Sequence, residues 1–420
     1  MKNITYQLRH FVFLAFTVLG LVSCAKGQEK SQEQQTKAPK GSPIVWESSV
    51  EAAFTKAKEQ NLPVFIECYH PTCPICMALE PTLKKPEVGD FYNQNFVNVK
   101  LDLSNAEMVK FLDSKKIYLP SFPMFLYFDK DQNIIHQAEP VNAVENIVKT
   151  GKAAIDPNQQ VTKFWDMYQN GNREVNLLTS LASFLRVTRD TTRNIQVAND
   201  LFAVYPKAEL GTETGWAITK KCVMDVDNGF AQYWFDHVPQ AAQYEAKAGH
   251  KDGETNALGM IIQTSIFSAR GNNYSTAQIA KIKTYMQKIG AGQYADGATW
   301  QQEAKALVRE NNAAKALTLI DGFAKKFSTN GQSLVFLTKF SNDLFKDQNY
   351  VTVAKSWLQK ATPLLKEKKD LAELHFEAAR LAQKANDKAT AQKELTLAIQ
   401  NATVAGLDMT RFTNLQSTLK

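Results

Sequence analysis

The chain has 420 residues, and its 49 Lys and Arg against 42 Asp and Glu give a formal net charge of +7. This length provides for two or three domains with buried cores. Five cysteines are too few for a disulfide scaffold, and the basic residues are scattered rather than clustered with aromatic ones, so we expect no nucleic-acid partner.

The first predicted element is a signal peptide over residues 1–23. Two basic residues precede an apolar run, Phe11–Val22, which is shorter than the roughly 20 residues that span a bilayer but suits a secretory leader. The run ends in LVSC, which resembles the lipobox of bacterial lipoproteins. That resemblance implies removal of the leader and a lipid anchor on Cys24. We therefore expect a protein of the bacterial cell envelope, anchored in the outer membrane and facing the periplasm.

Residues 24–43 follow as a predicted flexible tether. They contain no aromatic residue and few apolar ones. Such a segment cannot bury enough apolar surface to offset the entropy lost on ordering.

Residues 44–155 predict an α/β domain. The elements expected in chain order are a helix at 48–61, a strand at 63–69, a helix from Pro74 to 85, a strand at 96–103, a helix, strands within 118–129 and at 133–138, and a helix at 142–154. This order favours an α/β sandwich around a mixed sheet.

Two cysteines, Cys73 and Cys76, lie three positions apart at the start of the helix that begins at Pro74. The free N–H groups and the dipole of a helix N-terminus favour a thiolate on Cys73. Cys76 lies one turn further on the same face, so it can attack a mixed disulfide formed through Cys73. Outside the cytosol such a pair is free to cycle between dithiol and disulfide.

These residues and their spacing resemble the thioredoxin superfamily. The positions that carry the resemblance are the nucleophilic Cys73, the resolving Cys76, the helix proline Pro81, the buried acid Glu67, the lysine that faces it, Lys100, and the cis-proline Pro123. The segment 83–105 looks closest to the envelope subfamily that includes the soluble end domain of transmembrane disulfide reductases.

The resemblance also implies roles for the surrounding residues. Glu67 is expected to act as the base for Cys76, with a pKa raised by burial and moderated by Lys100. A purely structural ion pair between Glu67 and Lys100 is the alternative. Pro123, in cis, and Phe122 are expected to line the substrate groove, and Phe122 indicates a more apolar groove than is usual in the family.

Two departures from the family leave the redox direction open. Thr72 stands where the family has tryptophan, and Pro-Ile separates the cysteines. His70 with the two cysteines would be the start of a zinc site, but no second ligand pair follows. We therefore expect no metal and no cofactor other than the redox-active disulfide Cys73–Cys76, with Cys68 and Cys222 as buried thiols.

Residues 156–420 predict an all-helical region. Residue types recur every 37 positions near its end: Leu307, Leu344 and Leu381; Asn312, Asn349 and Asn386; Ala324, Ala361 and Ala398. The pattern resembles tetratricopeptide-like (TPR-like) helical hairpins, which bury their apolar stripes by stacking. A docking surface for a protein partner and a rigid support for the redox domain are both open interpretations.

Two functional hypotheses follow. The first is a lipid-anchored envelope thiol–disulfide oxidoreductase, a reductase or interchange enzyme, which acts on protein disulfides and needs an upstream redox partner. The second is a redox-silent binding or chaperone-like lipoprotein whose helical repeats recruit a partner protein.

Overall fold

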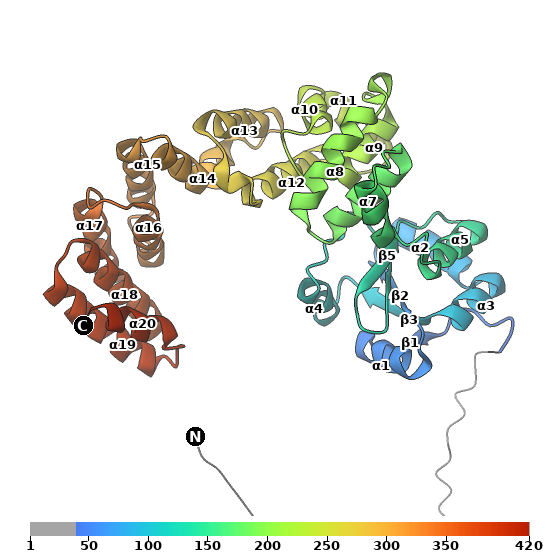
Figure 1. Ribbon diagram of the computed structural model, residues 1–420, viewed down its shortest axis with the longest axis horizontal. Coiled ribbons are helices and arrows are strands. Elements are labelled where there is room, and N and C mark those ends of the chain that lie inside the picture. The colour runs from blue at the N-terminus through green and yellow to red at the C-terminus, as the bar shows by residue number, and fades with distance from the viewer. Residues whose placement is uncertain (1–38, 420) are drawn as a thin grey trace, which may run out of the picture. The chain divides into compact units, whose positions relative to one another are not determined.

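A five-stranded mixed sheet forms the centre of the first domain (Figure 1). Its strands are β1 (Trp46–Glu47), β2 (Val64–Tyr69), β3 (Val97–Asp102), β4 (Met124–Phe128) and β5 (Ile134–Ala138). They are ordered β1-β3-β2-β4-β5; β1, β3 and β2 run parallel, whereas β4 and β5 pair antiparallel. The computed structural model describes residues 39–419, so the predicted leader, Cys24 and most of the tether lie outside the described residues.

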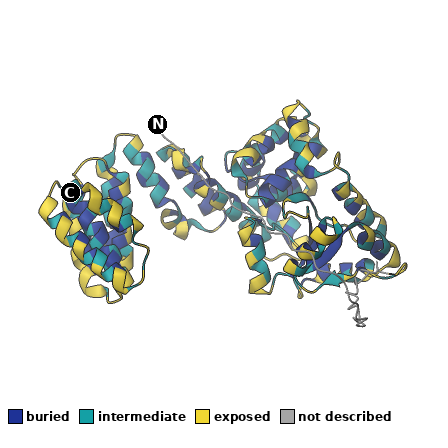
Figure 2. Cartoon of the chain, turned by 60° about the horizontal axis from the view of Figure 1, so that its bottom comes forward, coloured by how far each residue is buried: buried dark blue, intermediate teal, exposed yellow. Residues whose placement is uncertain are grey.

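Helices cover both faces of the sheet. The helices are α1 (Val50–Gln60), α2 (Pro74–Leu83), α3 (Pro86–Asn95), α4 (Ala106–Ser114) and α5 (Val144–Ile155). Residues of α1 and α4 share one apolar cluster with Val64, Ile66 and Cys68, whereas residues of α2, α3 and α5 share another with Phe65. Successive side chains of β2 therefore point to opposite faces. Figure 2 shows the strands dark blue between helices whose outer faces are exposed.

The first domain is thioredoxin-like, as the motif spacing implied, with two elements that the sequence did not predict. β1 has only two residues, too few for a periodic signal, and pairs with β3 at the sheet edge. The predicted helix from Pro74 ends at Leu83, and a separate helix, α3, begins at Pro86. A proline is favourable at the first position of a helix, which explains why the new helix starts there.

The rest of the described chain is helical (Figure 1). Its α-helices are α6 (Phe164–Gln169), α7 (Val175–Val187), α8 (Thr191–Val204), α9 (Glu213–Cys222), α10 (Gly229–Asp236), α11 (Val238–Lys247), α12 (Gly253–Phe267), α13 (Thr276–Lys288), α14 (Ala295–Arg309), α15 (Ala313–Lys326), α16 (Gly331–Leu344), α17 (Val351–Ala361), α18 (Lys368–Lys384), α19 (Lys388–Val404) and α20 (Thr410–Thr418). None of the helices described between residues 39 and 419 combines the length and apolar character needed to cross a membrane.

Three helical hairpins, α14–α15, α16–α17 and α18–α19, account for the repeat of 37 residues. Ala324, Ala361 and Ala398 are buried at matching places in their second helices, which agrees with the predicted repeat. The asparagines do not match. The turn residues with a left-handed backbone are Asn311 (φ 58°) and Asn386 (φ 59°). The structural equivalent of Asn386 is therefore Asn311, one position before the Asn312 that the sequence repeat predicted.

The helical region packs directly on the sheet domain, within one compact unit that begins at Lys40. Val187, the last residue of α7, is fully buried in the same apolar cluster as α1 and α4. The predicted boundary after residue 155 stays a prediction, since the core of the first domain takes in a side chain from beyond it.

Candidate active site

Cys73 caps the N-terminus of α2. Its backbone is extended, and its Sγ accepts a hydrogen bond from the N–H of Cys76 at 3.3 Å. This N–H is one of those that a helix leaves without an internal partner at its N-terminus, so it favours negative charge on the sulfur. The side chain is 8% exposed, and thus reachable from one side.

Cys76 is the more deeply buried thiol of the pair. Burial raises its pKa to about 12, and the hydrogen bond that the Cys76 thiol donates to Cys73 and the negative charges of Cys73 and Glu67 act in the same direction. Cys76 therefore stays protonated at neutral pH and needs a base before it can act as a nucleophile.

Glu67 lies behind the cysteines in the centre of the sheet. In the parallel register of β2 and β3 its partner is Lys100, as the resemblance implied. Glu67 is 1% exposed, and burial raises its pKa to about 7, although Lys100 lowers it. Its Oε2 lies 3.4 Å from Lys100 Nζ, and this buried oxygen lacks a hydrogen-bond partner among the described residues.

Glu80 is a site residue that the sequence analysis missed. It projects from α2, and its Oε2 accepts a hydrogen bond from Lys100 Nζ at 2.5 Å, closer than the contact between Lys100 and Glu67. Burial opposes ionisation, but hydrogen bonds from Lys100 and Lys84 leave the pKa of Glu80 below its ordinary value. The available signal was its position four residues after Cys76, which puts both side chains on one helix face.

Lys100 is thus shared between two carboxylates. Its Nζ also lies 5.0 Å from the ring centre of Trp46 and 5.5 Å from that of Tyr69. Burial alone would lower the pKa of Lys100, but the carboxylates of Glu67 and Glu80 hold it above the ordinary value, so the ammonium group stays charged in a half-buried place. The ion pair between Glu67 and Lys100 is present, and Glu80 joins it as a third member.

The Phe122–Pro123 peptide bond is cis, as expected from the family pattern. The carbonyl oxygen of Phe122 lies 3.9 Å from Cys73 Sγ, within reach of the thiol as donor. The Phe122 ring stacks on the imidazole of His70, with the ring centres 5.8 Å apart. The structure thus brings Cys73, Phe122 and Pro123 together.

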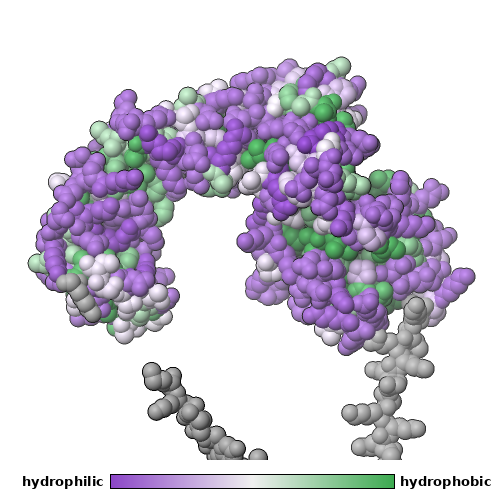
Figure 3. Space-filling model, viewed as in Figure 1, coloured by the Kyte–Doolittle hydropathy of each residue, from purple (hydrophilic) through white to green (hydrophobic). Residues whose placement is uncertain are grey.

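Exposed apolar side chains border this place. Ile75 and Met77 on the first turn of α2 are 59% and 57% exposed, and Phe122 is 42% exposed. Figure 3 shows hydrophobic surface gathered near α2 and β5 on a face that is otherwise mostly hydrophilic. An extended apolar chain segment would cover these side chains beside Cys73.

The other two cysteines are fully buried, as predicted. Cys68 belongs to the apolar cluster on the opposite face of the sheet from Glu67, and Cys222 ends α9 within the helical core. Burial raises the pKa of both thiols, to about 12 for Cys222. His70 is engaged with Thr72, whose Oγ1 lies 2.9 Å from its Nδ1. No group of three or more potential metal-binding side chains occurs within residues 39–419.

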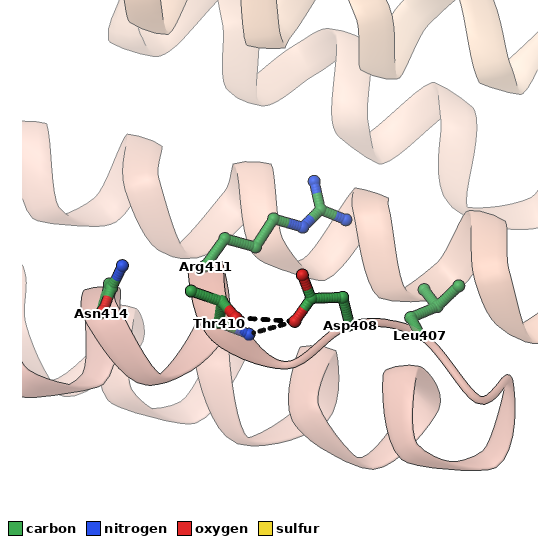
Figure 4. A pocket seen from close by; sticks show the side chains of 5 residues that line it. All are labelled: Leu407, Asp408, Thr410, Arg411 and Asn414. Carbon is green, nitrogen blue, oxygen red and sulfur yellow. Dashed lines mark hydrogen bonds between the residues drawn. The ribbon is translucent and has the colours of Figure 1, made fainter. Parts of the chain in front are cut away.

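A separate pocket lies at the turn between α19 and α20 (Figure 4). Its carboxylate, Asp408, accepts hydrogen bonds from the backbone N–H and the hydroxyl of Thr410 at 2.9 and 2.7 Å. These bonds hold the turn just before α20, so this carboxylate serves the fold.

Comparisons with known proteins concern the N-terminal part of the chain, which includes the thioredoxin-like domain. A family model described as "Thioredox_DsbH: Protein of unknown function, DUF255" matches residues 28–166. Spermatogenesis-associated protein 20 of Rattus norvegicus is 37% identical over 78 residues, and that of Homo sapiens is 34% identical over 78 residues. Each of these two matches covers 18% of this chain and 9% of the relative, so the match spans only a small part of either protein.

A solved structure titled "DsbH Oxidoreductase" is 19% identical and covers 29% of this chain and 92% of its own, with a TM-score of 0.25. The fold assignment rests on the strand order and on the helices on each face of the sheet. The described part of the first domain therefore has the fold of thiol–disulfide oxidoreductases, and its two cysteines lie at the start of α2.

Proposed function

We propose that the chain is a protein thiol–disulfide oxidoreductase that uses the dithiol of Cys73 and Cys76 as a reductase or interchange enzyme. The observation that carries the proposal is the pairing of Cys73, which caps α2 and is 8% exposed, with the more deeply buried Cys76, whose pKa the charge of Glu67 helps to raise while one oxygen of Glu67 lacks a hydrogen-bond partner among the described residues. Cys222, by contrast, ends α9 within an apolar cluster of the helical region.

The reaction follows from these positions. The Cys73 thiolate attacks a substrate disulfide, a mixed disulfide forms, and one substrate sulfur leaves as a thiolate. Cys76 then loses its proton to Glu67 and attacks Cys73 Sγ. The second substrate thiolate departs, the substrate has gained two electrons, and Cys73 and Cys76 are joined as a disulfide. A dithiol protein upstream must supply two electrons to reduce this disulfide again.

Trapping of the intermediate tests the proposal. The Cys76→Ser variant should accumulate mixed disulfides through Cys73 when it meets a disulfide-bonded protein, because the resolving thiol is gone. Cys73→Ser in the same assay is the matched control and should trap nothing. The redox-silent binding lipoprotein would be favoured if the wild-type protein neither reduces protein disulfides nor oxidises protein thiols and if Cys76→Ser forms no mixed disulfide.

We also propose that the enzyme is held in the bacterial envelope by a lipid on Cys24. The support is the leader of residues 1–23 with its LVSC ending. Growth with an alkyne-bearing fatty acid should label the wild-type protein and fail to label Cys24→Ala. Release of the unlabelled variant from the membrane fraction would agree with the anchor, and equal labelling of both would contradict it.

Docking of a partner protein on the helical repeats is part of the same proposal.

A further inference from the structure

The loop between α4 and β4 is held from outside the thioredoxin-like domain. This loop, residues 115–123, is here called the substrate loop, because it ends at Phe122 and Pro123. The N–H of Tyr118 donates a hydrogen bond to the carbonyl of Val187 in α7 at 2.8 Å. Val187 is itself buried in the apolar cluster under the sheet, so this end of α7 is fixed in place.

Arg186 strengthens the same attachment. It is 3% exposed, and its guanidinium lies 5.8 Å from the ring centre of Tyr118 and donates a hydrogen bond to the carbonyl of Val223, just after α9. An arginine so deeply buried is costly, and the described structure gives it an aromatic ring and a carbonyl rather than a carboxylate. Arg186 therefore links α7, the residue after α9 and the substrate loop.

A second attachment is polar. The hydroxyl of Ser121 donates a hydrogen bond to Glu139 Oε1 at 2.9 Å, and the other oxygen of Glu139 forms an ion pair with Lys221 of α9. Nearby, Gln137 Nε2 donates to Ser183 Oγ of α7 at 3.2 Å. A pocket of about 480 Å³, lined in part by Gln137, Glu139, Ser183 and Lys221, lies beside these contacts.

The two attachments lie immediately before the reactive part of the loop. Ser121 precedes Phe122, whose carbonyl oxygen is 3.9 Å from Cys73 Sγ. Lys221 of the helical region is thus connected to the neighbourhood of Cys73 through two side chains, Glu139 and Ser121. A displacement of Ser121 must move Phe122, because the two residues share a peptide bond.

We propose that α7 and α9 are positioning elements of the substrate loop and that Lys221 is a positioning residue for substrate binding. The helical region sets where Phe122 lies, and with it the affinity for a substrate chain that lies along the loop. The reactivity of Cys73 itself does not depend on Lys221. The inference rests on the proposed function for its catalytic test, and on the structure alone for its exchange test.

The catalytic test compares Lys221→Gln with Lys288→Gln in the full chain. Lys288 pairs with Asp236 in the helical region and is 39% exposed, close to the 42% of Lys221. Lys221→Gln should raise the KM for a disulfide-bonded protein about threefold to fivefold, the range expected for loss of a partly exposed ion pair. The kcat and the Cys73–Cys76 reduction potential should stay unchanged. Lys288→Gln should change none of the three.

A double-mutant cycle with Glu139→Gln isolates the connection. Glutamine at position 139 keeps a carbonyl that can accept from Ser121 but loses the charge that pairs with Lys221. Each single variant should raise KM to a similar extent, and the double variant should be no worse than either, because both act through one contact. Additive increases would contradict the connection.

Hydrogen exchange tests the inference without any activity. Lys221→Gln should speed amide exchange in residues 115–123 relative to wild type and to Lys288→Gln, while the strands β2 and β3 exchange as before. If the wild-type protein has no redox activity, the proposed function is wrong. The exchange test then decides by itself whether Lys221 positions the substrate loop. Unchanged exchange in the loop together with an unchanged KM would overturn the inference.

Discussion

Glu67 of the thioredoxin-like domain and Glu245 of the helical region are both buried, and their pKa values move in opposite directions. Glu67 retains an oxygen without a hydrogen-bond partner among the described residues, and its pKa rises to about 7 through burial. Glu245 on α11 is also buried but accepts hydrogen bonds from Trp216 Nε1 at 2.5 Å and from Lys220, and contacts His250 Nδ1 at 2.9 Å. Burial opposes ionisation there too, yet these contacts lower the pKa of Glu245.

The difference teaches that burial alone does not make a reactive carboxylate. Hydrogen bonds and opposite charges counteract the effect of burial, and the balance between them sets the direction of the pKa shift. Glu245 is satisfied and supports the fold, whereas Glu67 is left short of partners next to a thiol that must lose a proton. Perturbed groups of the second kind collect at functional sites.

The largest expected effect contrasts the cysteines of the two regions. Cys73→Ser should abolish disulfide reduction, because no other described thiol caps a helix at an accessible place. Cys222→Ala should keep full activity and lower the free energy of unfolding by about 1 kcal/mol, since it removes a buried sulfur. The measurements are turnover with a disulfide-bonded protein and urea unfolding. Full activity of Cys73→Ser would contradict the assignment of Cys73 as the nucleophile.

The resolving step should depend on Glu67. Glu67→Gln should slow release of substrate from the mixed disulfide about hundredfold, the range for loss of a general base. In wild type this rate should rise as pH increases through about 7, where Glu67 becomes ionised, and the variant should lack this rise. Stopped-flow measurement of substrate release from pH 5 to 9 follows both effects, and Glu245→Gln serves as the control with an unaltered profile.

The stabilities of the same two variants should change in opposite directions at pH 8. Glu67 has a folded pKa above its unfolded value, so its favourable contribution is complete below about 4.5 and is lost as pH rises through about 7. A shift of one pKa unit corresponds to at most about 1.4 kcal/mol of folding free energy. Because glutamine stays neutral, Glu67→Gln should raise the free energy of unfolding by about 2 kcal/mol at pH 8. At pH 4 the two proteins should unfold alike.

Glu245 follows the reverse sign. Its pKa is depressed in the folded protein, so its contribution is present above the unfolded value and is lost as pH falls below it. Glu245→Gln should cost about 2 kcal/mol at pH 8, because Lys220 and His250 lose their anionic partner but remain partly exposed to water. Urea unfolding at pH 4 and pH 8 checks both variants, and equal signs would contradict the distinction.

The smallest expected effect concerns the helical hairpins, where substitutions should alter stability rather than chemistry. Asn311 has a left-handed backbone (φ 58°), whereas Asn312 makes no capping hydrogen bond with its side chain. Asn311→Ala should therefore cost about 1 kcal/mol, and Asn312→Ala should cost less than about 0.5 kcal/mol. Thermal unfolding of both variants tests which asparagine is the turn residue. A larger loss of stability in Asn312→Ala than in Asn311→Ala would favour the register predicted from the sequence.

Local patterns were enough to predict much of the fold and part of the site. The helix at 48–61 has buried residues at Val50, Ala53, Phe54 and Ala57, because apolar spacing of three and four positions marks one helix face. Patterns failed where the signal is short or interrupted. The two residues of β1 carry no period, and Pro86 starts a helix, α3, after the predicted one has ended.

The sequence by itself determined the cysteine spacing, the thioredoxin-like order of elements, the alternation that separates Glu67 from Cys68, and the buried alanines of the repeat. These depend on residues close together in the chain or on a fixed period. Only the tertiary structure decided that Glu80 shares Lys100 with Glu67, that Val187 enters the core of the first domain, and that Lys221 reaches Ser121 through Glu139. Such contacts join residues 18 or more positions apart, where no periodic pattern in the chain records which side chains meet.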